Sequence, residues 1–449
     1  MRICSVPSPR LSSTGSRRRF GTDATIGWRW PSRSVAWRQS GAVRVGQPMS
    51  GRCGRGAREI LRLLQVTGTL DPSYGGPPVV MNQLTRSLLE LGHETEGVTL
   101  DSPTDPWLAE CSGEVHALGP SLGRYRYCRR LLPWLRLHAN HYDALIVHGI
   151  WQYQSFAVRS ALRVSDVPYF VFTHGALDPW FKRQYPFKHA KKVLYWPWAE
   201  YRVLRDASAV LFTCEEERVL ARESFGPYRA REAVVGFGIE DPVGDAAGQR
   251  SAFLDKYPLL RDKRVLLFLS RIHRKKGCDL LLRAFADASR HDAEIHLVVA
   301  GPDQSGWRAD LESLARSFGI DERVTWTGML TGDVKWGAYR VADAFVLPSH
   351  SENFGIVVPE ALACGLPVLI TNKVNIWREI DGSGAGLVEN DTVAGATALL
   401  RRWLNLSERE SNLMRRQARV CFVQYFELRT AARRLAELIA RDIGEVHSG

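Results

Sequence analysis

The chain has 449 residues, of which 45% are apolar, and carries a formal net charge of +12 at pH 7. This length exceeds what one hydrophobic core usually serves and predicts two or three domains. Residues 1–58 contain twelve Arg and one Asp but no Lys or Glu, so this head accounts for +11 of the charge. The remaining residues are nearly neutral, which argues against nucleic-acid binding by a folded face. No run of eighteen apolar residues occurs, so no membrane-spanning helix is expected.

The head itself, residues 1–58, is expected to be disordered, because it is rich in Arg, Ser, Gly and Trp and has no hydrophobic periodicity. Its shortage of acidic residues is typical of an organellar transit peptide, yet it has no clear amphipathic helix and no apolar segment of a secretory signal. We favour the interpretation that the head is not part of the native protein and that Met49 is a true start. The eight cysteines are scattered without a Cys-x-x-Cys pair, which predicts reduced thiols in a cytosolic protein.

The first predicted strand covers residues 60–66, and a loop then leads to Gly75-Gly76 and to a helix that begins at Pro77. Glycines at this position let a ligand approach the backbone at a helix N-terminus. A tight turn would need glycine just as much. The position directly after the first strand favours the ligand-binding interpretation.

Two later apolar runs, 143–148 and 169–174, are also predicted strands, and both end in a His-Gly pair. Residues at the carboxyl ends of parallel strands face the crevice in which ligands bind. We expect a structural or supporting role for His148, and we take His174 as a candidate site residue.

A basic motif follows the predicted strand 265–269 and precedes a helix that begins at Asp279. Its cations are Arg271, Arg274, Lys275 and Lys276. Ligands bind at this edge of an open parallel sheet, and cations there complement a diphosphate, Arg through a bidentate fork and Lys as a point charge. A solvated basic turn would explain the charge but not its placement between a strand and a helix.

Two carboxylates, Glu352 and Glu360, stand eight positions apart in the motif Ser351-Glu-Asn-Phe-Gly-Ile-Val-Val-Pro-Glu360. The motif follows a predicted strand at 344–348 and enters a helix at Pro359, where the helix dipole favours an anion. The loop offers backbone N–H groups to a phosphate or a sugar, and the carboxylates can accept hydrogen bonds from hydroxyls. In the alternative interpretation, Glu360 only stabilises the helix end and Glu352 is a solvated loop charge.

Strands and helices alternate through the rest of the second half, with predicted strands at 294–300, 324–328 and 367–370 and predicted helices at 311–318 and 334–342. Such alternation predicts an α/β fold in which helices cover both faces of a parallel sheet. The glycine-containing segment 234–239 is the predicted boundary between two domains of this kind.

Basic and aromatic residues interleave in two stretches of the first half, 124–136 and 182–198. This combination suits the headgroup layer of an anionic membrane. A solvated face whose aromatic side chains pack into the core explains the pattern equally well. Prolines inside both stretches interrupt any single long amphipathic helix.

These motifs, in this order, make the chain from residue 59 onward resemble the retaining nucleotide-sugar glycosyltransferases of family 4, which have the GT-B fold of two Rossmann-like doubly wound domains facing a central cleft. The matching residues are Gly75-Gly76, Thr173-His174-Gly175, Ser270-Arg271, Lys276-Gly277, Glu352, Glu360 and the run Pro359-Glu-Ala-Leu-Ala-Cys-Gly-Leu-Pro-Val368. The resemblance implies an acceptor-side domain at 59–235, a nucleotide-sugar-binding domain at 236–421, and a C-terminal helix at 422–449 that returns to the first domain.

The resemblance also implies a role for each candidate residue. Arg271 and Lys276 would hold the donor diphosphate, Glu360 would bind the ribose, and Glu352 would lie near the donor sugar. His174 would lie near the reaction centre, where it can donate a hydrogen bond to a sugar hydroxyl or stabilise developing charge. The backbone at Gly75, Gly76, Asn353, Phe354, Gly355 and Ile356 would contact the sugar and the phosphates.

No Asp-x-Asp motif occurs, so protein cations are expected to stabilise the leaving diphosphate, with no metal and no cofactor beyond a UDP- or GDP-sugar co-substrate. The implied activity transfers a hexose of the glucose or mannose type to a glycan or lipid-linked acceptor, with retention of configuration, in surface polysaccharide biosynthesis. The implied location is the cytoplasm, with peripheral contact at the inner face of an anionic membrane. Two alternatives stay open: a GT-B nucleotide-sugar hydrolase or epimerase, and an inactive scaffold that binds glycans, or nucleic acid through the Arg-rich head.

Overall fold

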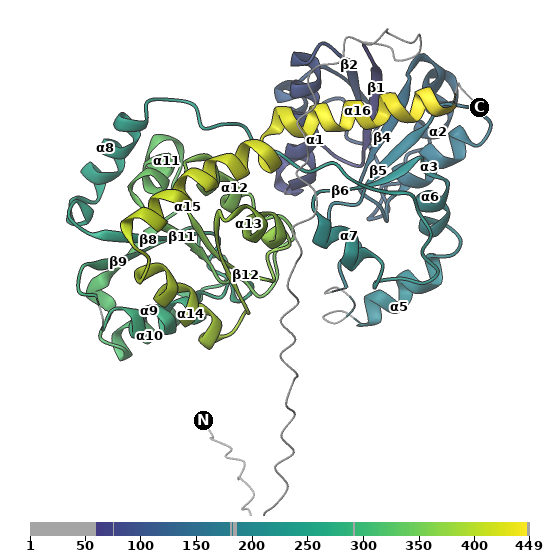
Figure 1. The fold of residues 1–449 in the computed structure, drawn as a ribbon. Coiled ribbons are helices and arrows are strands. Elements are labelled where there is room, and N and C mark those ends of the chain that lie inside the picture. The colour runs from purple at the N-terminus through teal and green to yellow at the C-terminus, as the bar shows by residue number, and fades with distance from the viewer. Residues whose placement is uncertain (1–59, 75, 180–181, 183–185, 291, 447–449) are drawn as a thin grey trace, which may run out of the picture. The chain divides into compact units, whose positions relative to one another are not determined.

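The computed structural model describes residues 60–74, 76–179, 182, 186–290 and 292–446, which belong to one compact unit of the chain (Figure 1). The predictions for residues 1–58 and for Gly75 lie outside these residues. Two parallel sheets organise the described chain, one of seven strands and one of six. Strands and helices alternate in both, which confirms the predicted α/β class.

The first sheet has the strand order β3-β2-β1-β4-β5-β6-β7, and all neighbouring strands pair in parallel. Its strands are β1 (Arg62–Thr67), β2 (Glu94–Thr99), β3 (Glu114–Ala117), β4 (Ala144–His148), β5 (Tyr169–Phe172), β6 (Ala209–Phe212) and β7 (Glu232–Val234). Every residue of β4 and β5 is buried, which explains why these strands are continuous apolar runs rather than alternating ones.

The helical segments between these strands are η1 (Pro72–Tyr74), α1 (Gly76–Glu90), η2 (Pro106–Glu110), α2 (Leu131–His138), η3 (Ala139–His141), α3 (Tyr153–Leu162), α5 (Pro186–Tyr195), α6 (Glu200–Asp206) and α7 (Glu215–Ala221). α1 begins at Gly76, one residue before the predicted start, and buries Val80, Leu84 and Leu88 at helical spacing. The first loop of the fold therefore leads directly into a helix N-terminus.

The second sheet has the order β10-β9-β8-β11-β12-β13 and is also parallel throughout. Its strands are β8 (Arg264–Leu269), β9 (Ile295–Ala300), β10 (Val324–Gly328), β11 (Ala344–Leu347), β12 (Val368–Thr371) and β13 (Gly386–Glu389). Its helical segments are α8 (Ala246–Lys256), η4 (Pro258–Leu260), η5 (Arg274–Lys276), α9 (Cys278–Ala288), α10 (Arg308–Ser317), η6 (Asp321–Arg323), α11 (Gly332–Val341), α12 (Val357–Ala363), α13 (Trp377–Ser383), α14 (Val393–Leu404), α15 (Glu408–Cys421) and the π-helical η7 (Phe422–Phe426).

Both sheets are doubly wound, because the strand order reverses beside β1 in the first sheet and beside β8 in the second. Ligands of such sheets bind outside the carboxyl ends of the strands at the point of reversal. Gly76, Lys276 and Glu352 lie in the segments that follow β1, β8 and β11 respectively, Gly76 at the start of α1 and Lys276 at the end of η5. The topology thus places the predicted motifs at the two ligand-binding edges.

The last helix, α16 (Leu428–Val446), packs against α1 (Figure 1). Its residues Ala432, Leu435 and Ile439 share a buried cluster with Leu63 of β1 and Ile146 of β4. The C-terminal end of the chain therefore contributes to the core of the first sheet. The domain limits 59–235, 236–421 and 422–449 stay predictions.

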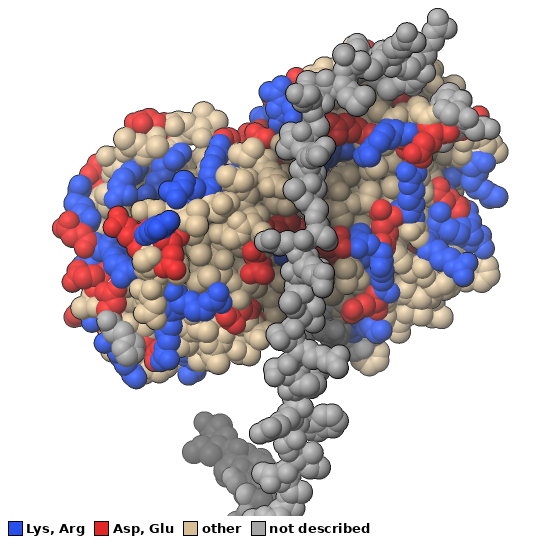
Figure 2. All heavy atoms as spheres, in the orientation of Figure 1, with Lys and Arg blue, Asp and Glu red and all other residues tan. Residues whose placement is uncertain are grey.

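Charged side chains of both signs intermingle on the face of the molecule seen in Figure 2. This mixture agrees with the near-neutral charge of the chain beyond residue 58. In the described part of the chain, no helix combines the length and apolar character needed to cross a bilayer. The six described cysteines, at positions 111, 128, 214, 278, 364 and 421, have free thiols.

Candidate active site

A cavity of about 400 Å³ collects most of the predicted site residues. It is lined by Gly76, Pro77, Val80, His174, Thr213, Phe237, Ser270, Arg271, Lys276 and residues 352–357. Of the predicted residues, only Gly75, which lies outside the described chain, and Glu360 are missing from this lining. Loops that follow strands of both sheets therefore meet at one cavity, whose size suits a small-molecule ligand.

Gly277 explains how the basic motif comes to lie beside the acidic one. It has a φ of 67°, and a Cβ atom at this position would lie 2.1 Å from the carbonyl oxygen of Pro348. Glycine permits this approach between the loop after β8 and the end of β11. The amide of His350 also donates a hydrogen bond of 2.8 Å to the carbonyl of Lys275. The two motifs are thus fastened together through their backbones.

Lys276 and Glu352 form an ion pair in the lining of the cavity, with the ammonium group donating to Oε2 of Glu352. Lys276 is buried, with 7% of its surface exposed. Burial, together with the charges of Arg271 and Lys275, lowers the pKa of Lys276 to about 8. Lys276 is therefore mainly protonated at pH 7, and its cation is held where the cavity can use it.

Arg271 is exposed and lies in the same lining. Its Nη1 atom donates a hydrogen bond of 3.3 Å to Oε1 of Gln304. Gly301, at the end of β9, has a φ of 137°, and a Cβ there would lie 1.8 Å from the carbonyl oxygen of Ser270. Gly301 thus lets the chain pass next to Arg271, a requirement that the sequence motifs did not indicate.

The loop from Glu352 to Val357 is held by the segment that follows β12. Glu352 donates its amide to the carbonyl of Lys373 at 2.8 Å and accepts from the amide of Asn375 at 3.0 Å. The side chain of Asn375 is buried and donates to Oδ1 of Asn353 at 3.2 Å. Within the described chain, the amides of residues 353–356 donate no hydrogen bond, so they can act as donors to a ligand.

Glu360 lies outside the cavity lining and is held by α11. Its Oε1 accepts from the ammonium group of Lys335 at 2.6 Å, and its Oε2 accepts from the hydroxyl of Tyr339 at 2.8 Å. Lys335 and Tyr339 are four residues apart on one face of α11, a spacing that sequence reasoning could have used but did not. Each carboxylate oxygen keeps a second lone pair, so a role for Glu360 toward a ribose stays a prediction.

His174 lies at the start of the turn after β5 and has a left-handed backbone, with a φ of 48° that is unusual for a residue other than glycine. The turn is anchored by Glu217, whose Oε1 accepts from the hydroxyl of Thr173 and the amide of Gly175. Its Oε2 accepts from the amide and the hydroxyl of Thr213. The buried carboxylate of Glu217 thus accepts four hydrogen bonds, two from the strained turn and two from Thr213, and these hold the turn in place. The sequence motifs did not indicate Glu217.

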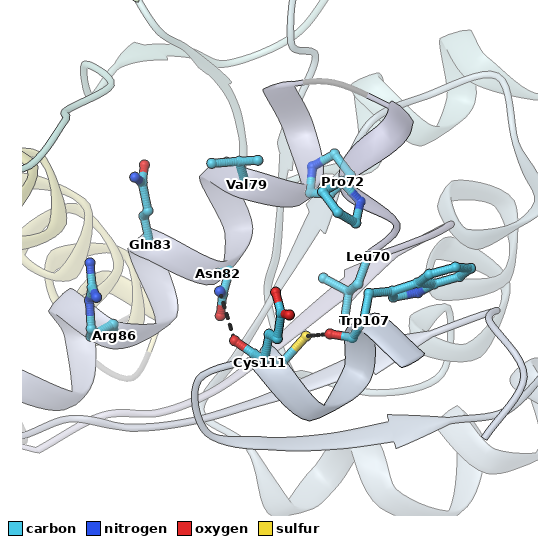
Figure 3. A pocket seen from close by; sticks show the side chains of 10 residues that line it. Leu70, Pro72, Val79, Asn82, Gln83, Arg86, Trp107 and Cys111 are labelled. Carbon is cyan, nitrogen blue, oxygen red and sulfur yellow. Dashed lines mark hydrogen bonds between the residues drawn. The ribbon is translucent and has the colours of Figure 1, made fainter. Parts of the chain in front are cut away.

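A second pocket, of about 300 Å³, lies between α1 and η2. Figure 3 shows Asn82, Gln83 and Arg86 following one another along α1, with Asn82 hydrogen bonded to the carbonyl of Glu110. The remaining lining residues are Leu70, Pro72, Pro78, Val79, Trp107 and Cys111. None of the predicted site residues lines this pocket.

In the described ranges, one group of side chains has the spacing of a cation site, namely Glu96, Glu114 and His116 on β2 and β3. Nε2 of His116 lies 2.7 Å from Oε2 of Glu96, which also accepts from the hydroxyl of Tyr142 at 2.6 Å. These contacts satisfy Glu96 without an ion. None of the three residues lines the 400 Å³ cavity.

Comparison with known families assigns the chain to a protein family. The family model described as "Glycosyl transferases group 1" matches residues 249–420, and the model described as "Glycosyl transferase 4-like domain" matches residues 75–238. The chain belongs to the group 1 glycosyltransferase family. The predicted resemblance is confirmed, and the two matches cover the regions of the second and the first sheet respectively.

Curated relatives carry related names. The chain is 32% identical over 228 residues to a D-inositol 3-phosphate glycosyltransferase of Geodermatophilus obscurus. The matched region covers 49% of this chain and 50% of the relative. It is 25% identical over 338 residues to the mannosylfructose-phosphate synthase of Agrobacterium fabrum. This match covers 68% of this chain and 73% of the relative. The chain spans about half the length of the inositol-phosphate relatives it matches.

Solved structures support the fold. HepE of Anabaena, solved with UDP and glucose, has a TM-score of 0.63 at 16% identity and covers 85% of this chain and 100% of that chain. Sucrose-phosphate synthase of Thermosynechococcus elongatus has a TM-score of 0.63 at 19% identity and covers 84% of this chain and 98% of that chain. These likenesses concern the fold alone, and they confirm the predicted GT-B architecture.

Proposed function

We propose that this protein is a glycosyltransferase that moves a hexose from a nucleoside diphosphate sugar to an acceptor hydroxyl with retention of configuration. The observation that supports this best is the ion pair of the buried Lys276 with the half-buried Glu352, beside Arg271 in the lining of one cavity. Cleavage of the bond between sugar and diphosphate leaves negative charge on the leaving group. Cations and N–H groups that are already in place stabilise such charge without reorganisation.

Each donor group has a separate task in this proposal. Lys276 has three N–H groups, of which Glu352 takes one, so two can bind phosphate oxygens. Arg271 spends one donor on Gln304 and can offer further N–H groups to the second phosphate. The amides of residues 353–356 complete the cradle, and Glu352 accepts a hydrogen bond from a hydroxyl of the donor sugar.

The two-carboxylate scheme of glycoside hydrolases does not fit this site. That scheme needs both carboxyl groups to flank the bond that is cleaved. Glu352 lines the cavity, whereas Glu360 is held by Lys335 and Tyr339 and lies outside the lining. We therefore assign the two glutamates to different parts of one donor, the sugar and the ribose.

The donor that we would test first is UDP-glucose, because HepE was solved in complex with UDP-glucose. GDP-mannose is the second choice. For the acceptor we propose a glycan or a lipid-linked sugar of surface polysaccharide biosynthesis. A soluble phosphorylated polyol or sugar is a second candidate, favoured by the names of the inositol-phosphate and fructose-phosphate relatives.

Thermal unfolding with a panel of nucleotide sugars tests the proposal. A true donor binds the folded state, so the melting temperature should rise with its concentration. Turnover of that donor with and without candidate acceptors then separates transfer from hydrolysis or epimerisation. Rapid release of sugar without any acceptor would favour the hydrolase or epimerase, and a panel in which no nucleotide sugar binds would contradict the proposal.

A lipid-linked acceptor would require contact with a membrane, and α5 offers a suitable surface. Phe187, Lys191 and Leu194 follow one another at helical spacing on α5, and Trp198 continues the row just beyond it. Phe187 is 88%, Leu194 77% and Trp198 72% exposed. Large apolar side chains next to an exposed lysine suit the headgroup layer of an anionic bilayer. We propose this row as the membrane-facing surface.

The other basic and aromatic stretch, 124–136, is built differently. The hydroxyls of Tyr125 and Tyr195 are hydrogen bonded at 2.8 Å, and Arg126 donates to the carbonyl of Gly68 and to the buried carboxylate of Asp101. These side chains have partners inside the protein. We restrict the membrane proposal to the row on α5, in which Phe187, Leu194 and Trp198 are the more exposed apolar side chains.

Sedimentation with vesicles tests the role of α5. We expect Leu194→Ser to reduce binding to vesicles that contain anionic lipid by up to about 30-fold, because up to about 2 kcal/mol of apolar transfer energy is lost. Val164→Ser is the control, since Val164 is 93% exposed and follows α3 rather than belonging to the row on α5. Equal binding of both variants and the wild type would contradict this part of the proposal.

A further inference from the structure

A line of buried hydrogen bonds runs through the first sheet to His174. Gln65 of β1 is fully buried and His148 of β4 is 2% exposed. Nε2 of His148 lies 3.0 Å from Oε1 of Gln65, and Nδ1 of His148 lies 3.1 Å from Nε2 of His174. His174 is the member of this line that borders the cavity. The proton positions along the line decide which kind of atom His174 presents there.

Thr85 of α1 determines which atom donates and which accepts in each hydrogen bond of this line. The hydroxyl of Thr85 lies 2.8 Å from the carbonyl oxygen of Met81, which can only accept, so the hydroxyl donates there. The oxygen of Thr85, 2.7 Å from the side chain of Gln65, must then accept a hydrogen bond. Only the amide nitrogen of Gln65 can donate it. The same nitrogen reaches the hydroxyl of Thr95 at 3.2 Å, which leaves Oε1 of Gln65 facing His148.

The proton positions on the imidazole rings of His148 and His174 follow from this orientation of Gln65. Because Oε1 of Gln65 only accepts, the proton of His148 is on Nε2. Burial holds the pKa of His148 well below its usual value, so the ring is neutral and its Nδ1 has no proton. That atom must accept from Nε2 of His174. Burial also lowers the pKa of His174 to about 4, so its Nδ1 is unprotonated as well.

The orientation of the His174 ring is fixed along with its tautomer. Its plane lies within 16° of the planes of both Phe172 and His148, with centroids 5.4 Å and 5.3 Å away. The left-handed backbone of His174 is held by the bonds from Thr173 and Gly175 to Glu217. In the described structure, Nδ1 of His174 has no hydrogen-bond partner.

We propose that Gln65 and His148 are positioning residues that fix the tautomer of His174, so that it presents an unprotonated Nδ1, an acceptor, to a hydroxyl of the donor sugar or the acceptor. This inference rests on the proposed function. It reverses the expectation that His174 donates a hydrogen bond to a sugar hydroxyl. An acceptor-only atom in the cavity selects ligands that have a hydroxyl at that point and disfavours those with fluorine or a methoxy group there.

Nitrogen NMR of the histidine side chains tests this directly, because the ¹⁵N shifts of protonated and unprotonated ring nitrogens differ. With signals assigned by comparison with His174→Ala, we expect the proton of His174 on Nε2 and that of His148 on Nε2 in the wild-type protein. A His174 that carries its proton on Nδ1 would overturn the inference. This readout needs no substrate, so a failure of the proposed function, seen as no nucleotide-sugar binding, is recognised separately.

The variant Gln65→Met removes the acceptor but keeps the side-chain length. We expect His148 then to move its proton to Nδ1 in part of the molecules, so that an Nδ1-protonated form of His174 appears. The value of kcat/KM should fall in proportion to the fraction of molecules in that form, by up to about tenfold, the loss expected for one hydrogen bond to the substrate. The matched control is Thr95→Val, which removes only the second partner of the Gln65 amide. It should keep both tautomers and kcat/KM within about twofold; a wild-type tautomer in Gln65→Met would also overturn the inference.

Discussion

The two sheets supply different kinds of polar group to the same cavity. The second sheet contributes the charged side chains of Arg271, Lys276 and Glu352. The first sheet contributes Thr213 and His174, and the ring of His174 is neutral and hydrogen bonded within the protein. In a transfer reaction, charge develops on the leaving diphosphate, whereas the sugar and the acceptor need orientation. We therefore assign stabilisation of the leaving group to the second sheet and orientation of hydroxyls to the first.

Removing the buried cation of Lys276 should reduce donor binding more than any other single change. In Lys276→Ala the diphosphate loses a charge-assisted partner and Glu352 is left without its cation. We expect donor affinity to fall about 100-fold, equivalent to about 2.7 kcal/mol. Titration calorimetry with UDP-glucose measures this loss.

Lys263→Ala is the matched control for that variant. Lys263 pairs with Glu294 at 3.1 Å and precedes β8, at the opposite end of the strand from Lys276. Its removal should leave donor affinity unchanged. Wild-type affinity in Lys276→Ala would remove the cation from the mechanism.

Filling the close approach at Gly277 should affect stability and donor binding nearly as much as the loss of Lys276 affects donor binding. A methyl group there meets the carbonyl of Pro348, so we expect Gly277→Ala to lower the free energy of unfolding by about 3 kcal/mol. It should also weaken donor binding, because the two motifs move apart. Urea unfolding and calorimetry measure the two effects.

Gly92→Ala separates the close approach from backbone strain. Gly92 has a φ of 86°, and no atom lies within 4 Å of the position that a Cβ would take there, so only the strain applies, about 1 kcal/mol. Donor affinity should be unchanged in this variant. Equal losses of stability in the two variants would show that the contact with Pro348 has no importance.

Donor binding should also depend on pH through Lys276. Since its pKa in the free protein is about 8, the cation is present below pH 8 and is lost as the pH rises through that value. Donor affinity should therefore fall by up to about tenfold for each pH unit above 8. The variant Lys276→Arg, which stays charged, should show no such fall. A flat profile in the wild type would contradict the assignment.

The smallest effect is expected at Glu360. Because its carboxylate is shared with Lys335 and Tyr339, Glu360→Ala should weaken donor binding only about fivefold, about 1 kcal/mol, and also reduce thermal stability. Calorimetry with UDP-glucose, with unfolding followed separately, distinguishes the two. Unchanged affinity would remove the ribose role.

The sequence predicted the features that depend on short stretches of chain. The strands at β1, β8 and β11 and the loops that follow them are encoded by local apolar runs and by glycines. The partners that hold the site lie far away in the chain and have no local signal. Asn375 reaches Asn353 across 22 positions, Glu217 reaches Thr173 across 44, and His148 reaches Gln65 across 83. Only the packing of the strands brings these residues together.

A structure of the protein with bound UDP tests most directly whether the second sheet holds the leaving group. We expect diphosphate oxygens to lie within hydrogen-bond distance of Nζ of Lys276 and of amides in residues 353–356. Glu352 would then keep a lone pair free for the sugar. A diphosphate bound elsewhere, or an empty cavity at saturating UDP, would contradict the assignment of the second sheet to the leaving group.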